Sequence, residues 1–147
     1  MMKTKFNTSI HYLSADTFTP VGLYLRLRDR YDRCFLLEST DSHSAENSYS
    51  FICCEPLLTF TAQKTENVLP RFNQFLNSIH VTSQSVLPVN GLFGYTAYEA
   101  VNCFDLSLHF KEKPSKGIPL MQYSFYRFII GINHFNDEMF VIENVPE

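Results

Sequence analysis

Residues 122–133 read QYSFYRFIIGIN, residues 134–138 read HFNDE and residues 139–143 read MFVIE. Aromatic and β-branched residues, which favour pleated strands, dominate the first and third of these segments. The polar segment between them is typical of a turn, so the sequence predicts a long β-hairpin. Strand alternation places Tyr123, Phe125 and Ile129 on one face and Tyr126, Phe128, Ile130 and Ile132 on the other. Both faces are apolar, and such a strand needs cover on both sides.

Two helices are predicted upstream of the hairpin. The first begins with Thr19 as its cap and Pro20 in the first helical position, where the missing N–H of proline costs nothing, and it runs to near Tyr31. The second spans residues 67–79 with Asn67 as its cap, because apolar residues recur there at helical spacing.

Strand character is also present at residues 33–39, 49–54, 57–62 and 91–98. Glu55 and Pro56 are expected to stop the second of these strands, and the first three would form a meander. Gly91 and Gly94 mark a bulge or a close approach of the backbone to a neighbouring segment. The element order is a strand, a helix, three strands, a helix, a strand and the hairpin. It predicts an α+β fold, with a mainly antiparallel sheet and two or three helices packed on it.

Length and charge exclude several classes of protein. The 147 residues suffice for a single domain covering residues 1–147. The net charge of −3 argues against a nucleic-acid partner. No apolar run approaches the roughly 20 residues that a membrane span needs, and the N-terminus lacks the apolar stretch of a secretory signal. We therefore expect a cytoplasmic protein with no membrane partner.

No pattern of catalytic or metal-binding residues is present. The five histidines form no zinc-binding motif. Asp41, Ser42 and His43 are neighbours in one loop and cannot adopt the geometry of a catalytic triad. The four cysteines contain no CxxC pair and are expected to be reduced, structural thiols. Tyr95 and Tyr98 are expected to pack in the core.

Several segments, in this order, resemble the N-terminal domain of anthranilate synthase component I and its chorismate-utilising relatives. They are Thr19-Pro20-Val21-x-x-Tyr24, Phe35-Leu36-Leu37-Glu38-Ser39, Tyr49-Ser50-Phe51-Ile52 with Pro56 after it, Gly91-Leu92-Phe93-Gly94-Tyr95-x-x-Tyr98-Glu99, and the hairpin with Asn133-His134 near its turn. The chain departs from the family pattern at Ser48, where arginine is usual, and at Cys53, where glycine is usual.

The resemblance implies a regulatory role. In this family the LLES strand end helps line a pocket for the inhibitor tryptophan, which implies L-tryptophan as a ligand of this chain. The residues implied for that pocket are Ser39, Glu38 and Leu37, with Ser50 and Pro20 as weaker candidates. Without the resemblance, Glu38 and Ser39 would be read as an ordinary strand-to-loop cap.

The resemblance also implies partners and limits. The family's catalytic domain, which binds chorismate and Mg²⁺, follows this region and has no counterpart in the 147 residues, so no catalytic residue and no cofactor is expected here. The whole enzyme would be a lyase of tryptophan biosynthesis with a glutamine amidotransferase subunit. Two alternatives remain open: the N-terminal domain of aminodeoxychorismate synthase component I, from folate biosynthesis, and a free-standing module that binds an aromatic amino acid.

Overall fold

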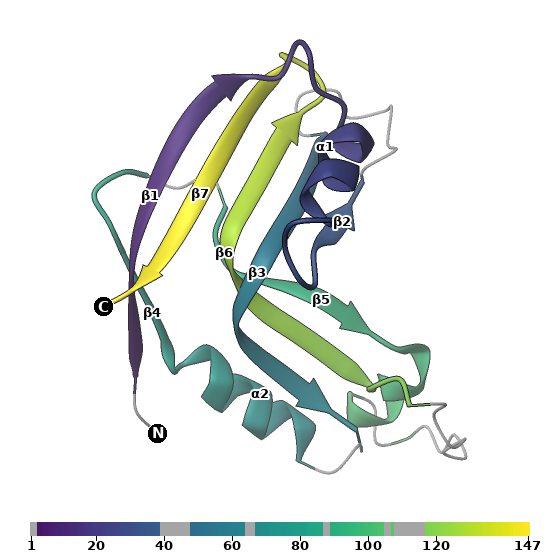
Figure 1. Ribbon diagram of the computed structural model, residues 1–147. Coiled ribbons are helices and arrows are strands. Elements are labelled where there is room, and N and C mark those ends of the chain that lie inside the picture. The colour runs from purple at the N-terminus through teal and green to yellow at the C-terminus, as the bar shows by residue number, and fades with distance from the viewer. Residues whose placement is uncertain (1–2, 39–47, 64–66, 87–88, 105–106, 108–116) are drawn as a thin grey trace.

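A curved sheet with helices on both faces forms the protein, as a computed structural model shows (Figure 1). The structure describes residues 3–38, 48–63, 67–86, 89–104, 107 and 117–147. Within those segments the sheet has seven strands: β1 (Thr4–Ser14), β2 (Phe35–Leu37), β3 (Tyr49–Ala62), β4 (Ile79–Ser83), β5 (Leu92–Thr96), β6 (Met121–Asn133) and β7 (Glu138–Pro146). The helices are α1 (Pro20–Leu27), α2 (Val68–Leu76) and the 3₁₀ helix η2 (Tyr98–Cys103).

The predicted α+β fold with a mainly antiparallel sheet is confirmed. The strand order is β2-β3-β6-β7-β1-β4, and β5 also pairs with β6. Every described pairing is antiparallel except that of β1 with β4, in which Thr4 lies opposite Ile79. The predicted hairpin is β6–β7, and β6 lies in the middle of the sheet, bonded to β3, β5 and β7.

β3 is continuous through Glu55 and Pro56, so the predicted stop at these residues was wrong, as was the three-strand meander. The pairing of β3 with β6 shifts between Pro56 and Leu58, where β3 has one residue more than its partner. Glu55 adopts a positive φ of 60° at this bulge. Because a bulge interrupts the ladder of hydrogen bonds, it tolerates a proline that a regular strand would exclude.

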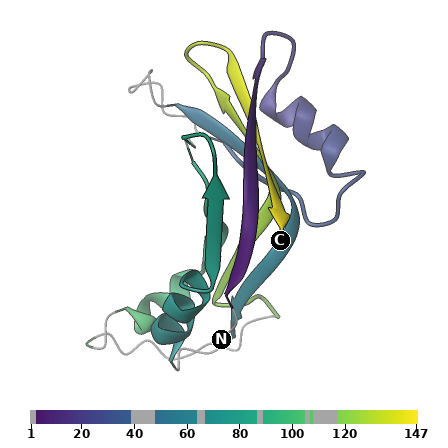
Figure 2. The same cartoon turned by 90° about the vertical axis from the view of Figure 1, so that its left-hand side faces the viewer.

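The bulge also changes the face to which the even-numbered residues of β3 point. Before it, Ile52 and Cys54 belong to a core with Leu23, Tyr24 and Leu27 of α1. After it, Phe60 and Ala62 belong to a different core with Val68 and Phe75 of α2. One extra residue reverses the alternation of side chains. Accordingly, α1 and α2 lie on opposite faces of the sheet (Figure 2).

β6 therefore receives cover on both faces, as its sequence predicted. Ile130 and Ile132 pack in the core under α1, whereas Ile129 packs on the other face with Cys53 and Ile142. The predicted alternation fails at Tyr126, which lies in the same core as Ile129. This residue pairs with Pro56 next to the bulge, where the strands bend (Figure 1).

Both predicted helices form, and both end earlier than expected. Thr19 caps α1 by accepting a hydrogen bond from the Gly22 amide at 3.1 Å, as predicted. α1 ends at Leu27, and the Tyr31 amide still bonds the Leu27 carbonyl in the turn that follows. Asn67 precedes α2 in a left-handed conformation with no side-chain capping bond, which differs from its predicted role.

Ile79, predicted as the end of the second helix, begins β4 instead. The Ser78 hydroxyl donates a 2.6 Å hydrogen bond to the Phe75 carbonyl and so satisfies an acceptor at the end of α2. From Ile79 onwards the backbone adopts the extended conformation of a strand, because it pairs with β1. Among the described residues, no helix has the length and apolar character needed to cross a membrane.

We predict that Gly94→Ala destabilises the fold by about 1–3 kcal/mol, because overpacking forces the backbone to shift. A Cβ at Gly94 would overlap the carbonyl oxygen of Gln122 on β6, which confirms the expected close approach at Gly94 but not at Gly91. Urea unfolding followed by circular dichroism measures the change.

Gly91→Ala is the matched control, because a Cβ at that position meets nothing within 4 Å. Its free energy of unfolding should stay within about 0.5 kcal/mol of the parent. Equal effects of the two substitutions would contradict the assigned close approach.

Candidate functional site

The end of the β2–β3 strand pair collects several of the residues that the sequence singled out. Leu37 is the last residue of β2 and pairs with Phe51 of β3. Glu38 follows Leu37 along the chain, and Ser50 precedes Phe51, so both lie at this end of the strand pair. Leu37 and Glu38 are exposed, whereas Ser50 is fully buried. Ser39 lies outside the described residues.

The start of α1 reaches the same end of the sheet. The Ala15 amide donates a 2.8 Å hydrogen bond to the Asp137 carbonyl in the β6–β7 turn, and this bond ties the segment before α1 to that turn. Pro20 is half-buried in the first helical position, after the Thr19 cap. Residues from α1, β2, β3 and the β6–β7 turn therefore meet at one end of the sheet (Figure 1). We call this region the sheet-end site.

Hydrogen bonds hold the β6–β7 turn against the start of β3. The Ser50 hydroxyl is hydrogen-bonded to Nε2 of His134 at 2.8 Å, and the His134 amide donates to the Ser48 carbonyl at 2.9 Å. Beside them, the Asn133 side-chain amide donates to the Tyr49 hydroxyl at 3.0 Å. Ser50 therefore orients the exposed imidazole of His134. Both residues stand in segments that the sequence motifs single out, but no local pattern predicts that they pair.

The chemistry of the sheet-end site favours binding over catalysis. A serine bonded to a histidine resembles a nucleophile with its base, but a fully buried hydroxyl cannot reach a substrate carbonyl. The exposed groups are the Glu38 carboxylate, the His134 imidazole and the Leu37 side chain. The Glu38 carboxylate can bind an ammonium group. Leu37 shares the face of its partner Phe51, whereas Ser50 and its partner His134 lie on the face that α1 covers. In the part of the chain that the structure describes, no cluster of three or more His, Cys, Asp and Glu residues could hold a metal ion.

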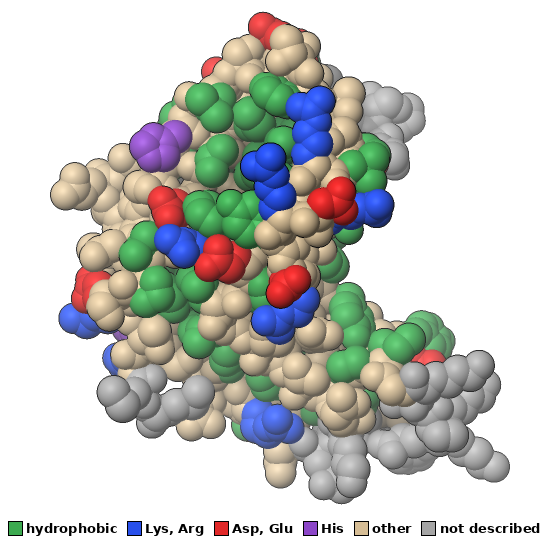
Figure 3. Space-filling model, in the orientation of Figure 1, with side chains coloured by type: hydrophobic (Ala, Val, Ile, Leu, Met, Phe, Trp, Pro, Cys, Tyr) green, Lys and Arg blue, Asp and Glu red, His purple; other side chains and the backbone are tan. Residues whose placement is uncertain are grey.

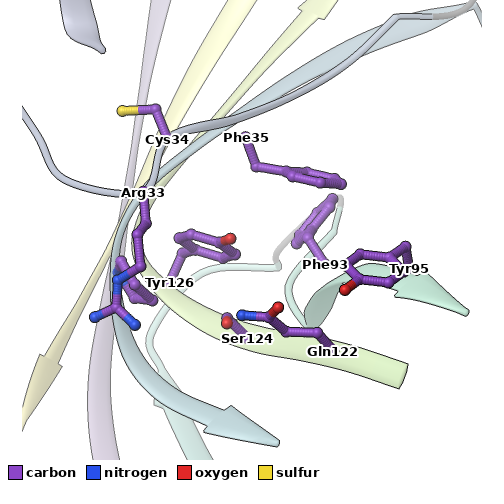
Figure 4. Close-up of a pocket in the computed structure, with 10 residues that line it drawn as sticks. Arg33, Cys34, Phe35, Phe93, Tyr95, Gln122, Ser124 and Tyr126 are labelled. Carbon is purple, nitrogen blue, oxygen red and sulfur yellow. The ribbon is translucent and has the colours of Figure 1, made fainter. Parts of the chain in front are cut away.

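A separate pocket of about 160 Å³ opens between β2 and β5. Its lining includes Phe35, Phe93, Tyr95, Gln122, Ser124 and Tyr126, which surround it in Figure 4. Burial is the main cause that raises the pKa of the Tyr126 phenol, so this group stays protonated at neutral pH. In Figure 3 the surface is hollowed on the side where β2 and β5 face each other. Ligand sites usually measure about 300–1,000 Å³, so this pocket alone suits only a small group.

The two tyrosines that were expected in the core differ in their exposure to solvent. Tyr95 is half-buried on β5 and lines the pocket. Tyr98 is 78% exposed, so its predicted core position was wrong. The strand ends at Thr96 and Tyr98 begins η2, and strand alternation therefore no longer determines which way it points. The sequence did not predict that Gln122, Ser124 and Tyr126 of β6 line a pocket. Alternation along a strand shows which face a residue is on, but it does not show which other strands lie over that face.

Comparison with known proteins gives one consistent result. The chain is 26% identical to anthranilate synthase component 1 of Lactococcus lactis over 92% of its own length, and 24% identical to the probable anthranilate synthase component 1 of Schizosaccharomyces pombe over 90%. It is 30% identical over 59% of its length to anthranilate synthase component 1 of Synechocystis sp.. No protein-family model matches. The resemblance inferred from the sequence motifs is confirmed.

The aligned regions make up 32%, 27% and 20% of these relatives. The chain therefore spans a third of their length or less.

We predict an energetic coupling of about 0.5–1.5 kcal/mol between Ser50 and His134, the usual net value of one hydrogen bond. Ser50→Ala, His134→Ala and the double variant form the cycle, and urea unfolding supplies the free energies.

His80 on β4 supplies the control, because β4 lies at the opposite edge of the sheet from the β2–β3 pair. Ser50→Ala and His80→Ala should be additive within about 0.5 kcal/mol. If the Ser50–His134 cycle is equally additive, the bond does not hold the turn.

Proposed function

We propose that this chain is the N-terminal regulatory region of an anthranilate synthase component I, and that its sheet-end site binds the feedback inhibitor L-tryptophan. The observation that carries the proposal is that Ser50, the β6–β7 turn and the segment before α1 lie at one end of the sheet, where β2 ends at Leu37 and Glu38 follows it. These segments are far apart in the sequence. The similarity to three anthranilate synthase component 1 proteins supports the same conclusion.

Three side chains have definite roles towards an amino-acid ligand. The Glu38 carboxylate pairs with the α-ammonium group, and such charge-assisted bonds are among the stronger ones in proteins. Leu37, 40% exposed, packs against the indole ring. The Ser39 hydroxyl can both donate to the ligand carboxylate and accept a hydrogen bond.

Two residues act indirectly. Ser50 is buried, and through its bond to His134 it positions the imidazole beside the site. Pro20 sets the direction in which α1 starts.

Inhibition follows if tryptophan binds more tightly to a low-activity arrangement of the enzyme than to the active one. The side chains of Leu37, Glu38 and His134 are exposed, so the described part of the site leaves one side of an indole ring uncovered. The catalytic region would supply the opposite wall, and the ligand would then stabilise one relative placement of the two parts.

The catalytic chemistry belongs to residues beyond the matched segment of the relatives. The whole enzyme would convert chorismate and ammonia to anthranilate, pyruvate and water, in the cytoplasm, as a lyase of tryptophan biosynthesis. A glutamine amidotransferase subunit would supply the ammonia, and Mg²⁺ would bind in the catalytic region. The three relatives are all named anthranilate synthase component 1, which favours this function over aminodeoxychorismate synthase.

The proposal is tested first on the native gene product. An antibody raised against this chain should detect a band much larger than 17.1 kDa in the source cells. The purified native protein should form fluorescent anthranilate from chorismate and ammonia, and tryptophan should inhibit this reaction. A band at 17.1 kDa would instead favour a free-standing module, and activity that is insensitive to tryptophan would remove the regulatory role.

We predict that Ser39→Arg in the native enzyme raises the tryptophan concentration for half-inhibition by about tenfold or more, which corresponds to a loss of at least about 1.4 kcal/mol. The arginine side chain would fill the site, while activity without tryptophan stays unchanged. Ser85→Arg is the control, because exposed Ser85 follows β4 at the other edge of the sheet. Inhibition that is unaltered in Ser39→Arg would exclude Ser39 from the site.

Glu38→Gln keeps the size of the side chain and removes its charge. Loss of a hydrogen bond to a charged group costs about 1.5–3 kcal/mol, so tryptophan inhibition should weaken by roughly 10- to 100-fold. Glu99→Gln is the matched control: Glu99 is exposed on η2, near the start of β6 rather than its end. The same response in both variants would show that Glu38 does not contact the ammonium group.

A further inference from the structure

Cys34, which directly precedes β2, is in contact with Cys54 of β3. The Cys34 thiol donates a hydrogen bond to the sulfur of Cys54, with 3.1 Å between the sulfur atoms. Phe35 pairs with Cys53 in the β2–β3 ladder, so Cys34 and Cys54 are the next pair across the two strands. Covalent bonding requires the sulfur atoms to approach by only about 1 Å, to about 2.05 Å.

The adjacent Cys53 points to the other face of the sheet. Cys54 belongs to the core under α1, against which Cys34 also packs, whereas Cys53 belongs to the core that contains Ile129 and Phe140. In Figure 4 the sulfur of Cys34 points away from the aromatic side chains of the β2–β5 pocket. Strand alternation thus selects one of two neighbouring cysteines as the partner of Cys34.

We propose that Cys34 and Cys54 form a reversible cross-strand disulfide, with a low-molecular-weight disulfide such as oxidised glutathione as the oxidant. The Cys34 thiol loses its proton to solvent, and its sulfur attacks one sulfur of oxidised glutathione, which forms a mixed disulfide at Cys34 and releases one glutathione thiolate. The sulfur of Cys54 then attacks the sulfur of Cys34, and the second glutathione leaves as a thiolate that takes up the Cys54 proton. The protein gives up two electrons, and one oxidised glutathione becomes two reduced molecules.

Exposure determines the order of these steps. Cys34 is partly exposed and can meet glutathione, whereas Cys54 is 1% exposed and reaches only Cys34. Burial also raises the pKa values of the Cys53 and Cys54 thiols, so neither is the first to react. A disulfide that forms in a reducing compartment is usually a transient, redox-sensing one.

The bond would link Cys34 at one end of β2 to β3, with Leu37 and Glu38 at the other end of the same short strand. The segment closed by the bond, residues 35–53, contains Leu37, Glu38, Ser39 and Ser50. Oxidation would therefore restrict the segment that carries the tryptophan-binding residues. This consequence rests on the proposed function, whereas the disulfide itself does not.

The test uses the 147-residue chain, incubated with oxidised glutathione and then alkylated. Intact mass spectrometry should show the loss of two hydrogen atoms with no glutathione attached. Cleavage after glutamate separates Cys34 from Cys53 and Cys54, because Glu38 and Glu46 lie between them. The oxidised chain should yield these two peptides as one linked product, and a phosphine reductant should release them.

Variants that lack one cysteine each show which two sulfur atoms form the bond. Cys34→Ser should remain unmodified at this pair, and Cys54→Ala should stop at the glutathione adduct on Cys34. Cys53→Ala and Cys103→Ala are the matched controls and should oxidise as the parent does. Circular dichroism checks that each variant is folded, and tandem mass spectrometry of the parent's linked peptide assigns the bond even if Cys54→Ala does not fold.

Three results would overturn the proposal. They are a parent chain that retains only the glutathione adduct or no modification, a link that persists in folded Cys54→Ala, and a link that involves Cys53 or Cys103. Because the readout is a covalent bond, the outcome is independent of whether the sheet-end site binds tryptophan.

Discussion

The extra residue that β3 accommodates opposite β6 determines how the rest of the structure is arranged. Without it, Ile52, Cys54, Phe60 and Ala62 would share one face, and both helices would compete for that face. With it, α1 covers the first pair and α2 covers the second on the other side. The guanidinium of Arg127 on β6 spans the bulge, with hydrogen bonds of 3.2 Å to Glu55 and 3.2 Å to Glu143 on β7. These contacts join three adjacent strands where the sheet bends.

At one end of the sheet, this arrangement exposes the side chains of Leu37, Glu38 and His134 among the described residues. The long strands β3 and β6 extend past the bulge on both sides, and α1 stays on the upper portion of one face, as Figure 1 shows. Short β2 ends beside the start of β3, and the β6–β7 turn is bonded to the same place through Ser50, Ser48 and Asn133. The sheet-end site is thus built on well-paired strands, although its exposed groups come from the residues next to them. The β2–β5 pocket lies towards the other end of β2 and contains a different set of side chains.

The proposed oxidation of Cys34 and the proposed binding of tryptophan use the two ends of one short strand. β2 has three residues and pairs only with β3 among the described strands. Such an edge strand has few hydrogen bonds to hold it, so ligand contacts at one end and a covalent bond at the other would both restrict it. The longer strands β3 and β6 have partners on both sides, so they are held more firmly than β2.

Local patterns in the sequence determined a large part of this protein. Alternating apolar residues predicted the β6–β7 hairpin, and Thr19 with Pro20 predicted where α1 begins. The LLES and YSFI segments made Leu37, Glu38 and Ser50 candidate site residues only through the resemblance to a known family. Each of these depends on neighbours along the chain. The bulge at Glu55, the bond from Ser50 to His134, the contact of Cys34 with Cys54 and the exposure of Tyr98 depend on partners that lie far apart in the sequence. Only the tertiary structure decided them, because strand register and sheet curvature determine which distant side chains meet.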